Sequence, residues 1–161
     1  MMNPTSRLLH IMALLSLAAV AVALVSQHAF DMRPCAWCVL QRLIFIAIAL
    51  VCWLGLLAGR IAIGLRRVAA LVAVLLSAGG VAAAWYQYTV AASLFSCDLT
   101  FADRLMVRSG LDSALPWLFG IQASCMDARV ELLGLEYALW GLGLFVVLGA
   151  LGLYALLRRL G

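Results

Sequence analysis

The chain has 161 residues, of which 67% are hydrophobic and only 11% are charged, and its mean hydropathy is +1.13. Soluble domains average about 45–50% apolar and about 25% charged residues. These figures argue against a water-soluble globule, a disordered tail and a nucleic-acid-binding domain. The formal charge of +4 comes from 11 arginines set against 7 acidic residues. We therefore expect an integral membrane protein.

Four charge-free windows predict four membrane-spanning helices. A span needs about 20 mostly apolar residues, and only a helix satisfies its own backbone hydrogen bonds in lipid. The first window is interpreted as an uncleaved anchor rather than a secretory signal, because it is longer than the usual apolar region of about 7–15 residues and no A-x-A site follows it. The predicted fold class is all-α, an integral membrane four-helix bundle forming one domain over residues 1–161, with spans near 9–26, 42–59, 68–89 and 136–157.

The charges predict how the bundle is oriented. Alternation of the spans places both termini and the connection between spans 2 and 3 on one side, which carries arginines and no acid, while every acidic residue lies on the other side. By the positive-inside rule, the arginine-rich side is cytoplasmic. The connections near 27–41 and 90–135 are then periplasmic, in a bacterial inner membrane. The arginines on the cytoplasmic side are Arg7, Arg60, Arg66, Arg67, Arg158 and Arg159.

The connection over 90–135 is long enough to suggest a functional segment. Its middle, residues 111–121, contains leucines, a tryptophan, a phenylalanine and an isoleucine. Such a segment is too apolar for free solution, and it predicts a short helix lying in the membrane interface. The alternative is a poorly ordered loop with a few apolar residues.

Four of the five cysteines fall on the predicted periplasmic face, where disulfides form and persist. They allow three pairings, of which the local one joins Cys35 to Cys38 and Cys97 to Cys125. Exchange between the couples can also join Cys38 to Cys97 transiently. Cys52 lies 14 residues beyond Cys38, roughly 21 Å along a helix, and is expected to be a buried apolar side chain.

The segment from Pro34 to Cys38 predicts a redox-active pair. Proline favours the first position of a helix, which would place Cys35 and Cys38 in the first turn of span 2, where the helix dipole favours a thiolate. A bridge between residues three apart is short and strained, hence easily reduced. Zinc binding is disfavoured because the other cysteines and the histidines are dispersed, so no metal site is predicted.

Two further features allow more than one interpretation. Arg42 follows Cys38 by four residues on the same helical face, so its guanidinium would stabilise a thiolate or bind a carbonyl-bearing ligand, or simply anchor the span at the interface. A Cys97–Cys125 disulfide would either brace the loop or relay electrons by thiol–disulfide exchange with the first pair.

The chain resembles the bacterial disulfide bond formation protein B (DsbB) family essentially from end to end. The residues that carry the resemblance are Pro34-Cys35-Ala36-Trp37-Cys38 with Arg42, Cys97-Asp98, Pro116, Cys125, and Leu133-Gly134-Leu135-Glu136 with Trp140.

The resemblance implies a membrane oxidoreductase that reoxidises a periplasmic dithiol oxidase of thioredoxin fold and passes the electrons to ubiquinone or menaquinone. It implies that the partner attacks a Cys97–Cys125 disulfide, and that the Cys35–Cys38 disulfide reoxidises that pair. It also implies that Cys38 passes electrons to the quinone, with Arg42 as the polar contact of the ring.

One position departs from the family pattern. Family members often carry a basic residue near the outer end of span 3, where this chain has Trp85, Tyr86, Gln87 and Tyr88. Gln87 would offer the quinone an amide hydrogen bond instead, or this stretch is an aromatic belt at the interface.

Two other functions compete with this one. A reductase resembling vitamin K epoxide reductase is also a four-helix membrane protein with a CxxC motif, but that family carries the motif near its fourth helix, whereas here it opens the second. A membrane scaffold with two static disulfides is the non-enzymatic alternative, and it predicts bridges that resist mild reduction.

Overall fold

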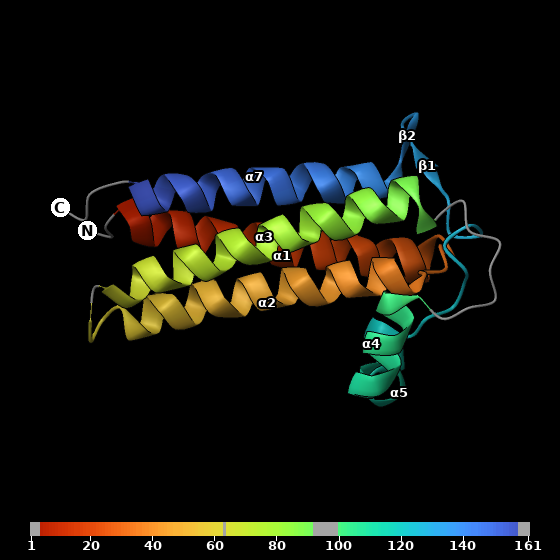
Figure 1. Ribbon diagram of the computed structural model, residues 1–161, viewed down its shortest axis with the longest axis horizontal. Coiled ribbons are helices and arrows are strands. Elements are labelled where there is room, and N and C mark those ends of the chain that lie inside the picture. Colours follow the sequence, from red (N-terminus) through yellow and green to blue (C-terminus); the bar gives the residue numbers. More distant parts are fainter. Residues whose placement is uncertain (1–3, 63, 92–99, 158–161) are drawn as a thin grey trace.

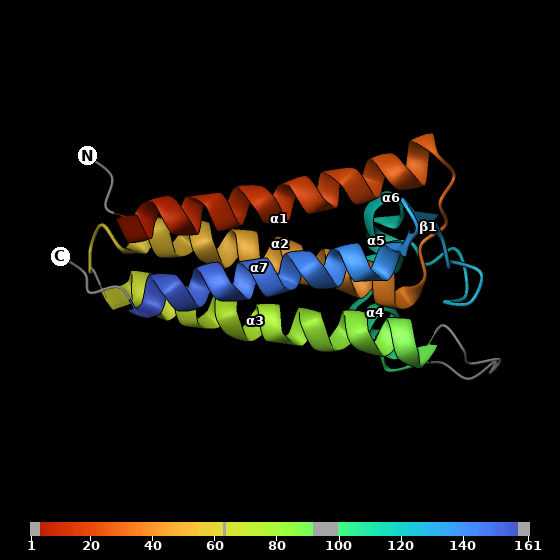
Figure 2. The same ribbon diagram turned by 90° about the horizontal axis from the view of Figure 1, so that it is seen from above.

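A computed structural model describes residues 4–62, 64–91 and 100–157. Its four long helices lie side by side along the long axis of the molecule (Figures 1 and 2). Each is long and apolar enough to cross a membrane, which confirms the predicted all-α membrane bundle. The helices are α1 (Pro4–Ala29), α2 (Ala36–Ala58), α3 (Gly64–Thr89) and α7 (Tyr137–Leu157).

Three helices extend beyond the spans expected from the charges, among them α3, which begins at Gly64 rather than near residue 68. Helix α1 covers residues on both sides of 9–26, and α2 begins at Ala36 rather than near residue 42. A charged side chain such as Arg42 marks a limit of apolar sequence, but it does not end a helix, because arginine is a good helix former. The connection between α1 and α2 is therefore shorter than the predicted segment 27–41.

The long connection forms three short helices. They are α4 (Phe101–Ser109), α5 (Leu111–Ala114) and α6 (Pro116–Phe119), and α4 packs beside the start of α2 (Figure 1). A capping box between Thr100 and Asp103 begins α4, and Gly110, with φ +68°, ends it. Helix α4 was not predicted. The short helix expected in the apolar segment is present as two pieces, α5 and α6, because Pro116 lacks the N–H that a continuous helix needs.

A two-stranded hairpin precedes α7. Strands β1 (Glu131–Leu132) and β2 (Leu135–Glu136) pair antiparallel. The turn residues Leu133 and Gly134 both have positive φ, as the tightest hairpin turns require. Trp140 in α7 donates from Nε1 to the Leu132 carbonyl at 3.2 Å, so the hairpin is held against the end of the bundle. It was not predicted, because Glu136 was placed in the last span.

Small residues bring the long helices close together. The rings of Phe45 in α2 and Phe145 in α7 stack with centroids 4.0 Å apart. Gly80 in α3 lies against Phe145, and a Cβ there would stand 2.4 Å from two atoms of its ring. Tight packing of this kind drives helix association in lipid, where the hydrophobic effect between helices is absent.

Gly80→Ala is expected to lower the thermal unfolding midpoint in detergent, because overpacking a tight contact costs about 1–3 kcal/mol. The neighbouring Gly79 faces open space, so Gly79→Ala is the matched control and should leave the midpoint unchanged or raise it. Equal midpoints for the two variants would show that the contact between Gly80 and Phe145 does not limit stability.

Candidate functional site

Cys35 and Cys38 lie at the N-terminus of α2, with their Sγ atoms 3.3 Å apart. Cys35 is the N-cap residue, and its side chain makes no capping hydrogen bond. The prediction that Pro34 is the first helical residue is wrong, because α2 begins at Ala36. The Pro34 carbonyl instead accepts a hydrogen bond from the Gln122 N–H at 3.0 Å, which ties this point of the chain to the long connection.

The loop after α6 brings Cys125 onto this pair. Its Sγ atom is 2.7 Å from that of Cys35, which is itself only 1% exposed. The position of Cys125 is supported by a turn in which Ser124 Oγ donates to Asp127 at 2.6 Å and accepts from the Asp127 N–H at 3.2 Å. Three sulfur atoms therefore stand in a row, with Cys35 in the middle.

The other two of the five cysteines are Cys97 and Cys52. Cys97 lies outside the described residues, so neither its pairing with Cys125 nor a junction with Cys38 is visible. Cys52 is fully buried in the bundle core, as predicted.

The sulfur contact changes the acidity of Cys35. Hydrogen bonding with Cys125, reinforced by burial and opposed by the hydrogen bond with Cys38, raises the pKa of Cys35 to about 12. At neutral pH Cys35 therefore keeps its proton when it is reduced, and it is a poor nucleophile because the thiolate is the attacking species. Its sulfur is better placed to be attacked than to attack.

Gln87 in α3 contacts Cys38 directly. Its Nε2 lies 3.2 Å from Cys38 Sγ, and its Oε1 accepts a hydrogen bond from Gln41 Nε2 at 2.7 Å. Both glutamines are 7% exposed. The sequence analysis placed Gln87 near the site as a ligand contact and missed Gln41, although its spacing of three from Cys38 puts it on the same helical face.

Arg42 donates its hydrogen bonds to oxygen atoms of α1 and α6. Its NH1 donates to Gln27 Oε1 at 2.5 Å and to the Leu118 carbonyl at 3.0 Å, and its NH2 donates to the Ala23 carbonyl at 3.3 Å. The side chain is 5% exposed. Arg42 thus joins α2 to α1 and α6, and it is not among the residues that line the pocket beside Cys38.

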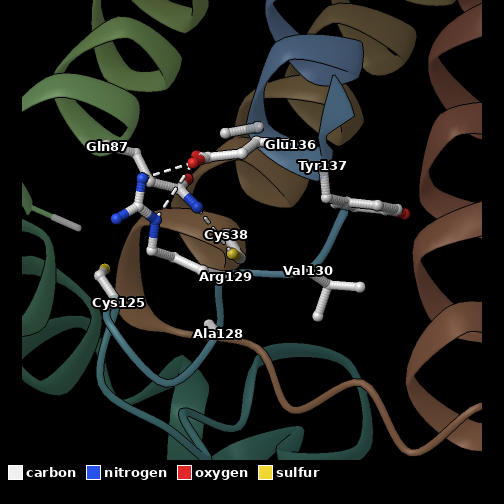
Figure 3. A pocket seen from close by; sticks show the side chains of 9 residues that line it. Cys38, Gln87, Cys125, Ala128, Arg129, Val130, Glu136 and Tyr137 are labelled. Carbon is white, nitrogen blue, oxygen red and sulfur yellow. Dashed lines mark hydrogen bonds and ion pairs between the residues drawn. The ribbon is translucent and has the colours of Figure 1, made fainter. Parts of the chain in front are cut away.

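A pocket opens next to Cys38 and encloses about 310 Å³, its open mouth included. Figure 3 shows Gln87, Arg129 and Glu136 facing one another above Cys38. Arg129 and Glu136 form an ion pair there. The residues that line the pocket are Cys38, Gln87, Cys125, Ala128, Arg129, Val130, Glu136, Tyr137 and Ala138.

The pocket combines polar and apolar groups. Gln87 Nε2 and the guanidinium of Arg129 supply N–H donors at it, and Val130 and Ala138 supply apolar surface. Cys38 is the cysteine of the α2 pair that reaches this space. Arg129 was not predicted, because in the sequence it is one of several charged residues in a loop.

Comparison with known proteins gives a consistent result. The model of the family described as disulfide bond formation protein DsbB matches residues 5–155. The chain is 33% identical to disulfide bond formation protein B of Herminiimonas arsenicoxydans, covering 98% of this chain and 99% of that one. It is 31% identical to the protein of the same name from Stutzerimonas stutzeri, over 87% of each chain. The protein of that name from Burkholderia pseudomallei is 30% identical, over 96% of this chain and 91% of its own.

Replacing Cys125 with alanine is expected to lower the pKa of Cys35, because the hydrogen bond with Cys125 is the main cause of its elevation. The thiolate fraction at pH 8 grows about tenfold for each unit of decrease. In the fully reduced protein, iodoacetamide should therefore alkylate Cys35 faster, and the midpoint of the pH profile should move down. Peptide mass spectrometry measures the rate at each pH, with Cys52→Ala as control. An unchanged midpoint in Cys125→Ala would contradict the assignment.

Proposed function

Because the chain belongs to the DsbB family, and is thus a membrane disulfide oxidoreductase, we propose that it reoxidises a periplasmic dithiol oxidase of thioredoxin fold and passes the electrons to membrane quinone. The observation that carries this proposal is the row of Cys125, Cys35 and Cys38 sulfur atoms, of which Cys125 and Cys38 line one pocket. Such a row connects a loop that a soluble protein can reach with a space at the bundle end that a lipid-soluble acceptor can enter.

The position of this row supports a periplasmic site in a bacterial inner membrane. Cys35 and Cys38 lie at the start of α2, and Cys125 contacts Cys35. The start of α2 is at the end of the bundle opposite the start of α1, the end of α7 and the end of α2 itself (Figures 1 and 2). Arginines gather at that opposite end, and by the positive-inside rule it faces the cytoplasm, together with both termini.

The first exchange takes two electrons from the partner. We propose that a partner thiolate attacks a disulfide between Cys97 and Cys125 and forms a mixed disulfide. The second partner thiolate then attacks the partner's own sulfur in that bond. The partner leaves with a disulfide, and Cys97 and Cys125 keep the electrons as thiols.

The second exchange moves these electrons along the row. The Cys125 thiolate attacks Cys35 Sγ, so that a Cys125–Cys35 bond forms, the Cys35–Cys38 bond breaks, and the electron pair goes to Cys38. The Cys97 thiolate then attacks Cys125, which restores the Cys97–Cys125 disulfide and releases Cys35. The separation of 2.7 Å between Cys125 and Cys35 supports this order, and so does the poor nucleophilicity of Cys35.

The reduced Cys35–Cys38 pair is then reoxidised at the pocket. A bound quinone, ubiquinone or menaquinone, would supply the acceptor for two electrons and two protons, so that Cys35 and Cys38 could form their disulfide again. Gln87 and Arg129 would hold its carbonyl oxygens, while Val130 and Ala138 exclude water from Cys38.

Arg42 has a separate role in this proposal. Its three acceptors are neutral oxygens on α1 and α6, so its positive charge is not cancelled by a carboxylate. Within one helical turn of Cys38, that charge favours a thiolate during exchange. Direct contact with the quinone ring, as the family resemblance implies, requires the guanidinium to give up one of these acceptors.

Purified protein supplied with quinone should oxidise a reduced thioredoxin-fold partner, and Cys38→Ser should remove quinone reduction entirely, because Cys38 carries the electron pair to the pocket. Cys52→Ala is the matched control, since this buried thiol takes no part, and it should keep the full rate. The absorbance change of the quinone measures turnover.

Normal turnover in Cys38→Ser would contradict the role of Cys38. Disulfides that resist mild dithiothreitol, and that added quinone does not restore, would instead support the alternative of a non-enzymatic membrane scaffold with static disulfides.

A further inference from the structure

Two buried glutamines link three helices around Cys38. Gln41 Nε2 in α2 donates to Gln87 Oε1 in α3, and Gln87 Nε2 contacts Cys38 Sγ. We propose that Gln87 stabilises Cys38 as the leaving sulfur through this N–H, and that Gln41 is the positioning residue that keeps the Gln87 amide in the donating orientation. This inference rests on the proposed function of Cys38.

The orientation of the Gln87 amide is set by its neighbour. With its oxygen on the Gln41 N–H, the amide must present its NH₂ group to the sulfur. The reverse orientation would bring two NH₂ groups together and leave a carbonyl oxygen against Cys38, which costs the hydrogen bond and adds repulsion.

The orientation of Gln41 is constrained in turn by α7. Its Oε1 lies against Gly141, where a Cβ would stand 2.7 Å from that oxygen. A glycine Cα–H at this point accommodates an oxygen and makes a weak favourable contact with it. The Gln41 NH₂ group is then the part that faces Gln87.

The proposed exchange with Cys125 places negative charge on Cys38 Sγ, which a hydrogen-bond donor stabilises. When Cys125 attacks Cys35, a Cys125–Cys35 bond forms, the Cys35–Cys38 bond breaks, and the electron pair of the broken bond stays on Cys38 Sγ. An N–H donor strengthens its hydrogen bond as that charge develops, and a buried site strengthens it further.

Few other groups can donate a hydrogen bond to Cys38 in place of Gln87. Arg42 on α2 contributes its charge, but its donors are engaged by α1 and α6, and Arg129 and Glu136 at the pocket are paired with each other. The titratable neighbours are the thiols of Cys35 and Cys125 and the phenol of Tyr137, which lines the same pocket.

Gln87→Met keeps the length of the side chain and removes the donor. In the fully reduced protein in detergent, it should slow iodoacetamide alkylation of Cys38 at pH 8 about tenfold and move the pH profile upward, because a hydrogen bond to a charged group is worth about a factor of ten or more. Peptide mass spectrometry reads the alkylation of Cys38 separately from that of Cys35.

Gln41→Glu provides a test that leaves residue 87 unchanged. A carboxylate at position 41 accepts from the Gln87 NH₂ group and turns the amide, so its carbonyl faces Cys38. Alkylation of Cys38 should slow in Gln41→Glu for two reasons, because the N–H is lost and because the new carboxylate disfavours a thiolate. In the Gln87→Met background only the charge effect remains, so the same change should slow alkylation less there. Gln41→Met, which removes the N–H that orients the amide and adds no charge, carries the test if Gln87→Met does not fold.

Ser77→Ala is the control. Ser77 is another buried polar residue of α3, but its hydroxyl donates to the Ala73 carbonyl of its own helix, so this variant should alkylate like the unmodified protein. Folded Gln87→Met or Gln41→Glu with an unchanged pH profile would overturn the inference.

Alkylation needs neither partner nor quinone, so the inference and the proposed function can fail separately. If the glutamine variants shift the pH profile of Cys38 alkylation but the unmodified protein does not reduce quinone, only the proposed function is refuted. If the unmodified protein reduces quinone but the variants leave this pH profile unchanged, only the role of the glutamines is refuted.

Discussion

The contact between Cys125 and Cys35 joins a loop outside the bundle to the first turn of a helix inside it, and the proposed electron route depends on it. Local structure holds both partners of this contact in place. The hydrogen bond from Gln122 to Pro34 fastens the loop to the chain just before α2, and the turn at Ser124 presents the next residue to Cys35. Without this hydrogen bond and turn, Cys35 and Cys38 would form an isolated pair at the start of α2, with no route for electrons from the loop.

The bundle contributes a closely packed frame at that end. Helices α1, α2, α3 and α7 each supply a polar residue or a close backbone approach there, and two hydrogen bonds join them directly: Arg42 donates to Gln27, and Gln41 donates to Gln87. Buried polar groups cost free energy when they are unpaired, so such a network favours one arrangement of the helices over its alternatives. Close packing at small residues along the bundle keeps that arrangement fixed.

The sequence was sufficient to predict the bundle, because four long apolar windows between charged segments leave lipid-spanning helices as the only solution. It also located Cys35 and Cys38 at the start of α2 and Gln87 near them. It did not predict α4, because the signal was only the capping pair Thr100 and Asp103. It did not predict the partners of Arg42 either, since side-chain direction depends on tertiary contacts. The contact of Cys125 with Cys35 likewise depends on the path of the loop after α6, which hydrophobic periodicity does not predict.

Disulfide trapping tests the central claim most directly. In a variant that combines Cys38→Ala, Cys97→Ala and Cys52→Ala, only Cys35 and Cys125 remain, and mild oxidation in membranes followed by peptide mapping reveals whether they join. The account predicts rapid and nearly complete formation of an intramolecular Cys35–Cys125 bond, because the sulfur atoms are already in contact. Two thiols that stay free, or that form bonds only between molecules, would contradict it.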